Sequence, residues 1–164
     1  MKKKRFHQIL QDKSRDNART PMQWDESVNG GFSDGTPWLQ VNTNYQTINV
    51  NAALKDTDSI FYHYQKLIKL RKEYKIISTG EYIPILENHP QVFGYKRSLN
   101  NQELIVLNNF YGQDVLLNLD VINYQVLINN YNEIDLTNLC LKPYQSVALY
   151  KKKFSFLVKL NFFL

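Results

Sequence analysis

The sequence has little cysteine or histidine, and this excludes several kinds of site. Cys140 is the only cysteine among 164 residues, so there is no disulfide framework, as is typical of the reducing cytoplasm. The three histidines are scattered, and no spacing of histidine, cysteine or carboxylate residues matches a metal site. No glycine-rich phosphate loop occurs either. We therefore expect no metal, no cofactor and a cytoplasmic location.

Long apolar runs are also missing. The basic start, residues 1–5, is not followed by the apolar stretch of a signal peptide, so secretion is not expected. The apolar part of residues 152–164 is too short and too charged to span a bilayer. Two interpretations of this atypical tail stay open: a frame-shifted or read-through end, which we prefer, and a basic segment that touches a membrane surface.

The net charge of +5 comes from the two ends of the chain. Residues 1–15 and 151–164 together hold ten Lys/Arg and one acid, which leaves residues 16–150 with ten Lys/Arg, fourteen acids and a net charge of −4. A mildly acidic body does not have the basic surface that nucleic acids require. We expect no nucleic-acid partner.

The densest group of polar side chains is the run KSRDNARTPMQWD at residues 13–25. Asp16 and Asn17 favour turns, and Pro21 disfavours a helix just before it, so the run is predicted to be a loop. Arg15 and Arg19 lie on either side of this Asp-Asn pair, and their guanidinium groups are suited to forked bonds with carboxylates or sugar hydroxyls. Two interpretations follow: a substrate-binding loop, or a structural loop fixed by an Arg-Asp pair.

The same run carries a family resemblance. Together with Gly31-Phe32-Ser33, Thr36-Pro37-Trp38-Leu39 and the segment at residues 59–72, it resembles the alpha-amylase family of glycoside hydrolases (family 13) over residues 11 to 150. The similarity is to the branch that contains oligo-1,6-glucosidases, trehalose-6-phosphate hydrolases and sucrose isomerases. It implies a retaining α-glucosidase of the cytoplasm as the parent activity, with an α-glucoside or a phosphorylated disaccharide as substrate.

The resemblance also assigns roles. In the family this region follows the last barrel strand, and the catalytic carboxylates lie upstream of it, so no catalytic residue is expected here. Arg15 takes the position of an arginine that reaches the glucose subsite beside an aspartate from an early barrel loop. Arg19 is assigned to substrate binding with it, or to bracing the loop.

The periodicity predicts a fragment of α+β class. The resemblance implies that residues 1–79 are the C-terminal remnant of a (β/α)8 barrel, with its long loop and its last helix at about 59–74. A whole barrel is excluded, because 164 residues are too few for one. The apolar side of that helix is predicted to pack against barrel strands. A helical turn is expected at residues 49–55, and four loop aromatics are expected to be buried: Trp24, Phe32, Trp38 and Tyr45.

After Gly80 the pattern changes to short β-type runs separated by turn residues. Residues 80–151 are therefore predicted to form an antiparallel β-sandwich. The expected strands are 81–87, 92–99, 103–110, 114–119, 124–129 and 146–151, with a further one at 136–141. The apolar stretch of residues 104–107 indicates a strand that is buried on both faces.

Three hypotheses follow, in order of preference. The chain is a piece of a glucosidase that is inactive alone, or it is active only after association with a separate barrel fragment, or it is a free-standing β-domain that binds carbohydrate. The last requires a row of exposed aromatic side chains, for which the candidates are Tyr82, Tyr95, Tyr111, Tyr124 and Tyr131.

Overall fold

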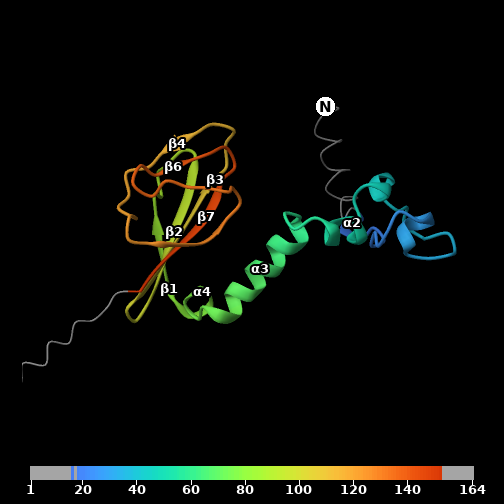
Figure 1. The fold of residues 1–164 in the computed structure, drawn as a ribbon, viewed down its shortest axis with the longest axis horizontal. Coiled ribbons are helices and arrows are strands. Elements are labelled where there is room, and N and C mark those ends of the chain that lie inside the picture. The colour runs from blue at the N-terminus through green and yellow to red at the C-terminus, as the bar shows by residue number, and fades with distance from the viewer. Residues whose placement is uncertain (1–15, 17, 153–164) are drawn as a thin grey trace, which may run out of the picture. The chain divides into compact units, whose positions relative to one another are not determined.

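The computed structural model describes residues 16 and 18–152, which form two compact units, one ending at Lys66 and the other beginning at Leu67 (Figure 1). Two predictions fall outside the described residues: the position of Arg15 and the tail beyond Lys152.

The first unit is a long loop that folds back on itself through a glycine turn. The turn is the 3-10 helix η2 (Val28–Gly31), in which Asn29, Gly30 and Gly31 have φ of 57°, 64° and 66°. Glycine adopts this left-handed region without strain, which is why two successive glycines suit the turn. The Trp24 amide donates to the Gly30 carbonyl oxygen (2.7 Å) and closes the loop.

Two asparagine caps begin the next elements. Asn42 precedes the 3-10 helix η3 (Thr43–Gln46), and Asn49 precedes α2 (Val50–Lys55), where its side chain accepts a hydrogen bond from the Ala52 amide (2.8 Å). Such caps satisfy helix amides that have no partner within the helix. The helical turn predicted at residues 49–55 is confirmed.

Helix α3 (Ile60–Glu73) confirms the helix predicted at residues 59–74, and none of its residues is fully buried. Five large side chains on the predicted apolar side are exposed: Ile60 84%, Phe61 41%, Tyr64 63%, Leu67 40% and Ile68 49%. The helix begins where the Ser59 carbonyl accepts from the His63 amide (3.1 Å), directly after a turn closed by the Asp56 carboxylate.

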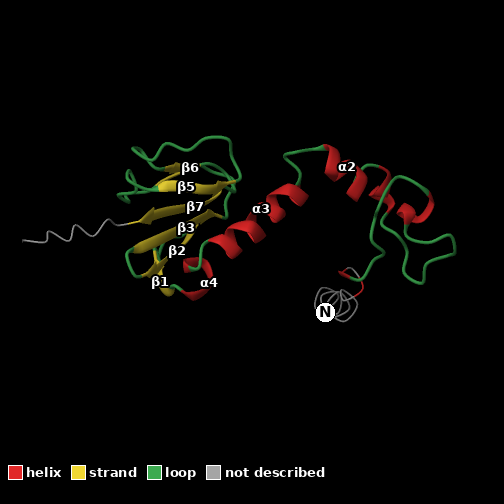
Figure 2. Cartoon of the chain, turned by 60° about the horizontal axis from the view of Figure 1, so that its bottom comes forward, coloured by secondary structure: helices red, strands yellow, loops and turns green. Residues whose placement is uncertain are grey.

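A short helix that the sequence analysis did not predict, α4 (Ile76–Thr79), follows α3 and lies beside the β1–β2 end of the sheet (Figure 2). Ile76 is fully buried there. Gly80 is the residue at which the helix ends. Only glycine fits there, because a Cβ at this position would lie 2.6 Å from the Ile76 carbonyl oxygen. The Arg97 guanidinium donates to the Gly80 carbonyl oxygen (2.9 Å) and fixes the turn to the sheet.

The second unit contains a five-stranded antiparallel sheet in the order β1-β2-β3-β7-β5. Its strands are β1 (Glu81–Ile85), β2 (Val92–Leu99), β3 (Gln102–Asn109), β5 (Gln125–Asn129) and β7 (Ser146–Lys152). All five were predicted, and β2 has the predicted bounds.

A two-stranded sheet of β4 (Val115–Leu116) and β6 (Cys140–Leu141) completes this unit. Both strands are shorter than predicted. Val115 and Leu141 join Leu107, Val147 and Leu149 in one buried core, so the small sheet covers one face of the large one. The antiparallel class of this domain is confirmed.

Strand β3 is covered on both faces, as the apolar run predicted. Ile105 and Leu107 enter the core under the small sheet, whereas Leu104 joins a second cluster with Ile76 and Leu127. Leu70 of α3 and Tyr74 pack against this second cluster. The sheet therefore has one face closed by β4 and β6, and one face covered at one end by α3 and α4.

Candidate functional site

The candidate site is the arginine loop of the first unit, of which the structure describes Arg19 but not Arg15. The Arg19 guanidinium donates to the Asp16 carboxylate (Nη1···Oδ1 3.2 Å), and both side chains are about half exposed, at 41% and 50%. Its Cζ atom lies 5.4 Å from the centre of the Trp38 ring, which is a cation–π contact. Arg19 is thus held between an acid and an aromatic ring of its own loop.

This arrangement leaves Arg19 part of its binding capacity. A guanidinium has five N–H donors, and Asp16 accepts from one of them. An exposed ion pair of this kind contributes little to stability, about 0–1 kcal/mol. Chemically, Arg19 can still donate to a hydroxyl or a carboxylate, while the pair with Asp16 sets its position.

The path of the loop is fixed by side-chain amides. The Gln23 amide donates to the Ile48 carbonyl oxygen (2.5 Å) and to Asn44 (3.0 Å), and so joins residues more than twenty positions apart. The Asn29 amide donates to the carbonyl oxygens of Ser33 (2.8 Å) and Gly35 (2.9 Å). A loop with this many internal bonds is a defined structure.

Asp25 fixes the turn that precedes η2. Its carboxylate accepts hydrogen bonds from the Ser27 hydroxyl and from the Ser27 amide (2.9 Å). These bonds favour the ionised form, and the pKa of Asp25 lies below its ordinary value for that reason, the hydroxyl having the larger effect. Gly31 is needed beside it, because a Cβ there would lie 2.8 Å from both carboxylate oxygens.

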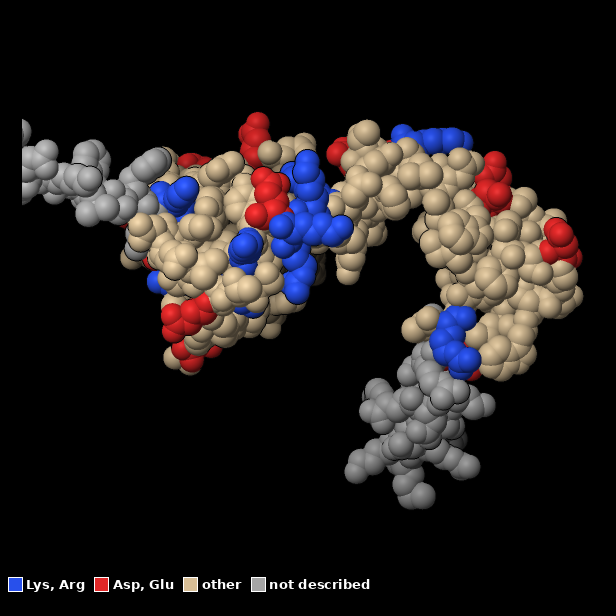
Figure 3. All heavy atoms as spheres, turned by 90° about the horizontal axis from the view of Figure 1, so that it is seen from below, with Lys and Arg blue, Asp and Glu red and all other residues tan. Residues whose placement is uncertain are grey.

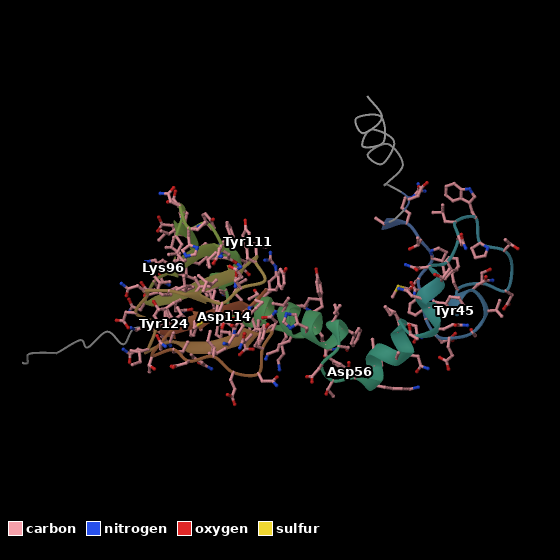
Figure 4. The ribbon with its side chains drawn as sticks, turned by 90° about the horizontal axis from the view of Figure 1, so that it is seen from above. Tyr45, Asp56, Lys96, Tyr111, Asp114 and Tyr124 are labelled. Carbon is pink, nitrogen blue, oxygen red and sulfur yellow. The ribbon has the colours of Figure 1, made fainter. Side chains whose placement is uncertain are left out.

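The loop aromatics do not have the burial that the sequence predicted. Trp24 is 51% exposed, Phe32 49% and Trp38 81%, so the prediction was wrong for these three, whereas Tyr45 is half-buried within the unit (Figure 4). The polar contacts above, rather than buried rings, hold the loop together.

The second unit contains a buried amide network that the sequence analysis missed. Asn109, 3% exposed, donates to the carbonyl oxygens of Gln113 (2.7 Å) and Lys142 (2.9 Å) and accepts from the Tyr111 amide (3.0 Å). Gln145, 1% exposed, accepts from the Lys142 amide (2.7 Å). The only available signal was the asparagine-rich composition of these turns. The network is structural, since it satisfies backbone groups of two loops, the one after β3 and the one after β6.

Tyr124 and Asp114 of the second unit, both labelled in Figure 4, each belong to an ionisable pair. Tyr124 donates to Glu103 (2.9 Å), and burial, followed by this bond, raises the pKa of Tyr124 well above its ordinary value. Lys142 contacts the Asp114 carboxylate at 2.7 Å, which raises the pKa of Lys142. The residues that the structure describes contain no group of three or more histidine, cysteine or acidic side chains suited to hold a metal.

Comparison with known protein families covers both parts of the chain. Residues 1–80 match the model of the alpha-amylase catalytic domain, and residues 92–148 match that of the alpha-amylase SusG C-terminal domain. The chain belongs to the alpha-amylase family. The resemblance predicted from the sequence is confirmed.

Named relatives give the same result. The chain is 54% identical over 141 residues to an oligo-1,6-glucosidase of Halalkalibacterium halodurans. This match covers 82% of the chain and 25% of the relative. It is 48% identical over 147 residues to a trehalose-6-phosphate hydrolase of Bacillus subtilis, and this match covers 85% of the chain and 26% of the relative. The crystal structure of a Bacillus licheniformis trehalose-6-phosphate hydrolase matches with a TM-score of 0.79 and 45% identity, over 89% of this chain and 28% of that one.

The chain therefore spans about a quarter of the length of the curated relatives it matches. Within residues 16 and 18–152, no helix is long and apolar enough to cross a membrane.

Proposed function

We propose that this chain is the C-terminal part of a cytoplasmic retaining α-glucosidase that acts on trehalose 6-phosphate or on short α-glucosides, and that it is inactive alone. The observation that carries the proposal is identity of 48–54%, over more than four-fifths of the chain, to relatives named for these two activities. Both relatives contribute only about a quarter of their length to the match, so the remaining three-quarters would supply the rest of the enzyme.

Residues 1–79 of this chain are proposed to supply the long loop and the last helix of a (β/α)8 barrel, and residues 80–151 the β-sandwich domain that follows. The match to the catalytic-domain model over residues 1–80 supports the first part. The outer helices of a barrel bury an apolar stripe against the strands. The apolar side chains of α3, from Ile60 at 84% exposure to Leu67 at 40%, make such a stripe available.

The two arginines of the loop are proposed to have different tasks. Arg15 would donate hydrogen bonds to hydroxyls of the bound glucose unit, next to an aspartate contributed by the rest of the parent. Arg19 already has an acidic partner, Asp16 at 3.2 Å, and a ring contact with Trp38, which supports a bracing role.

Catalysis is proposed to come from two carboxyl groups outside this chain. In a retaining glycosidase one carboxylate attacks the sugar and the other protonates the leaving oxygen and then activates water, at a separation of about 5 Å. The contribution of this chain is then to shape the glucose subsite. The same chemistry serves trehalose 6-phosphate and 1,6-linked glucosides, which differ only in the leaving group.

A hybrid enzyme tests the proposal. Residues 13–150 would replace the corresponding last quarter of the Bacillus subtilis trehalose-6-phosphate hydrolase, and hydrolysis of trehalose 6-phosphate and isomaltose would be measured for the hybrid and for the 164-residue chain alone. We expect the hybrid to hydrolyse at least one of the two and the chain alone to hydrolyse neither. A folded hybrid without activity, or turnover by the isolated chain, contradicts the proposal.

Arginine substitutions in the hybrid separate the two tasks. Loss of a charge-assisted hydrogen bond to substrate lowers kcat/KM by about 10–100-fold, which we expect for Arg15→Leu. Arg19→Leu should lower the melting temperature of the hybrid and change kcat/KM less than Arg15→Leu does. Lys66→Gln, an exposed residue of α3, is the matched control and should change neither.

A further inference from the structure

One face of the five-stranded sheet carries exposed aromatic side chains. The strand register places Tyr82 and Pro84 of β1 on the same face as Phe93, Tyr95 and Arg97 of β2. Tyr82 and Phe93 are each 49% exposed, and the Tyr95 ring lies between them, with ring centres 5.4 Å and 6.0 Å away. We call Tyr82, Phe93 and Tyr95 the aromatic strip.

The other end of this same face is already covered. Arg97 is opposite Leu104, and Leu104 is opposite Tyr150, so these residues continue the face of the aromatic strip. Leu104 is 2% exposed because Leu70, Tyr74 and Ile76 of the α3–α4 segment pack over it, and the Tyr74 ring meets the Tyr150 ring edge-on at 5.0 Å. Val106, opposite Tyr95, still packs against this cluster, whereas Tyr82 and Phe93 beyond it are half exposed.

The segment that provides this cover belongs to the catalytic-domain match. That match ends at residue 80, and the C-terminal-domain match begins at residue 92. The packing of Leu70, Tyr74 and Ile76 on Leu104 is therefore an interface between catalytic-domain sequence and the β-domain, and the aromatic strip continues it along the sheet.

We propose that the aromatic strip is the second half of this interface, and that its occupant is the part of an alpha-amylase catalytic domain that this chain does not contain. The proposal rests on the proposed function, because it requires a parent in which catalytic domain and β-domain are joined. The three rings carry no charge themselves, and Arg97, the charged residue opposite Tyr82, donates to the Gly80 carbonyl oxygen. Such rings suit an apolar protein surface, and aromatic side chains are enriched at protein interfaces.

A hollow beside the strip gives the partner a place to insert. It has a volume of about 530 Å³, and Tyr82, Phe93, Phe110 and Tyr111 lie in its wall. Phe110 and Tyr111 are 66% and 51% exposed, so four large rings around one hollow are open to solvent in this chain. A volume of this size also suits one or two sugar rings, which makes a bound α-glucoside the competing outcome of the test.

Tyrosine nitration measures directly whether the aromatic strip is accessible to solvent or covered by the catalytic domain. The isolated 164-residue chain, at 1 μM or below to avoid self-association, and the hybrid enzyme described above would be treated with tetranitromethane and analysed by mass spectrometry. We expect Tyr82 to be nitrated in the isolated chain and to lose most of its nitration in the hybrid. Tyr144, 65% exposed and outside the strip, is the matched control and should react in both.

Substitutions add a second readout in a two-chain assay, in which the first three-quarters of the Bacillus subtilis relative is expressed separately and titrated with this chain. Replacing two half-exposed rings, Tyr82→Ser with Phe93→Ser, should weaken association about 10–100-fold. The control pair Leu116→Ser with Ile122→Ser removes equally exposed apolar side chains and should leave association unchanged.

The outcomes distinguish this inference from the proposed function. An active hybrid in which Tyr82 reacts as in the isolated chain overturns the inference and leaves the proposed function standing. A folded hybrid without activity in which Tyr82 is protected overturns the proposed function alone. Protection of Tyr82 in the isolated chain by added maltose or trehalose 6-phosphate overturns the inference in favour of a sugar site.

Discussion

The apolar side of α3 gives the most direct prediction: the isolated chain should self-associate through it. Burying a large apolar side chain is worth about 1.5–3 kcal/mol. Weighting this range by the exposed fractions of Ile60, Phe61, Tyr64, Leu67 and Ile68 gives about 4–8 kcal/mol for one helix. In a symmetric pair both helices gain this amount, which offsets the lost freedom of association.

Self-association on this scale is measurable. A free energy of about 4–8 kcal/mol corresponds to dissociation constants of about 1 mM to 1 μM. We expect sedimentation velocity between 1 and ~200 μM, a range set by those constants, to show concentration-dependent association or precipitation of the wild-type chain. The triple variant Ile60→Gln, Leu67→Gln, Ile68→Gln should stay monomeric, and its melting temperature should fall only slightly, because none of the three side chains is fully buried (exposure 84%, 40% and 49%).

A matched variant separates apolar burial from general surface effects. Lys66→Gln with Lys69→Gln changes exposed residues elsewhere on the same helix and should leave the association as in wild type. The reasoning is refuted if the wild-type chain is a monomer throughout the concentration series, or if the control variant reduces association as much as the triple variant does.

Three further predictions concern stability. Asn109→Ala should lower the free energy of unfolding by about 2–4 kcal/mol in denaturant titrations, since it removes three buried hydrogen bonds to backbone groups, of which only the Lys142 carbonyl oxygen keeps another donor, the Gln145 amide. The exposed Asn118→Ala should cost under about 0.5 kcal/mol. Gly80→Ala should cost about 1–3 kcal/mol in the same assay, because its Cβ would lie 2.6 Å from a helix carbonyl oxygen; a neutral result contradicts the packing at this turn. Because the pKa of Asp25 is lowered from its ordinary value of 3.8, the ionised carboxylate stabilises its turn at pH values above 3.8, and this contribution is lost as the pH falls through the folded pKa. The Ser27 amide resonance should therefore shift at low pH in the wild type and not in Asp25→Asn.

The strands and α3 were predictable because their sequences repeat. Strand β2 alternates in its first residues, 92–95, and the four apolar residues of β3 indicated burial on both faces, which Leu104 and Leu107 confirm. Helix α3 has enough residues to show a period of 3.6. Family membership was also predictable, since the arginine loop holds a long run in fixed order.

Other features had no local signal. Helix α4 has four residues, too few to show a period, and it forms because Ile76 fills the space over Leu104. The amide network joins Asn109 to Lys142, which lies 33 positions away, and no pattern within a short window encodes such a bond. In the arginine loop the sequence indicated an Arg-Asp pair, which Arg19 and Asp16 form, but it gave no sign of the contact between Arg19 and Trp38, which depends on a fold over nineteen residues.

The distribution of apolar side chains within this one chain separates a complete core from an incomplete one. Under the small sheet, Leu107, Leu141 and Leu149 are fully buried, so the β-domain has the closed core of an independent unit. On α3 no residue is fully buried although its apolar spacing is that of a packed helix, and much of the surface in Figure 3 belongs to uncharged residues. Exposed apolar surface of the kind found on α3 is typical of a site that a partner covers. The family supplies one candidate for that partner, the rest of the catalytic domain, and the association, nitration and hybrid experiments each test it through different residues.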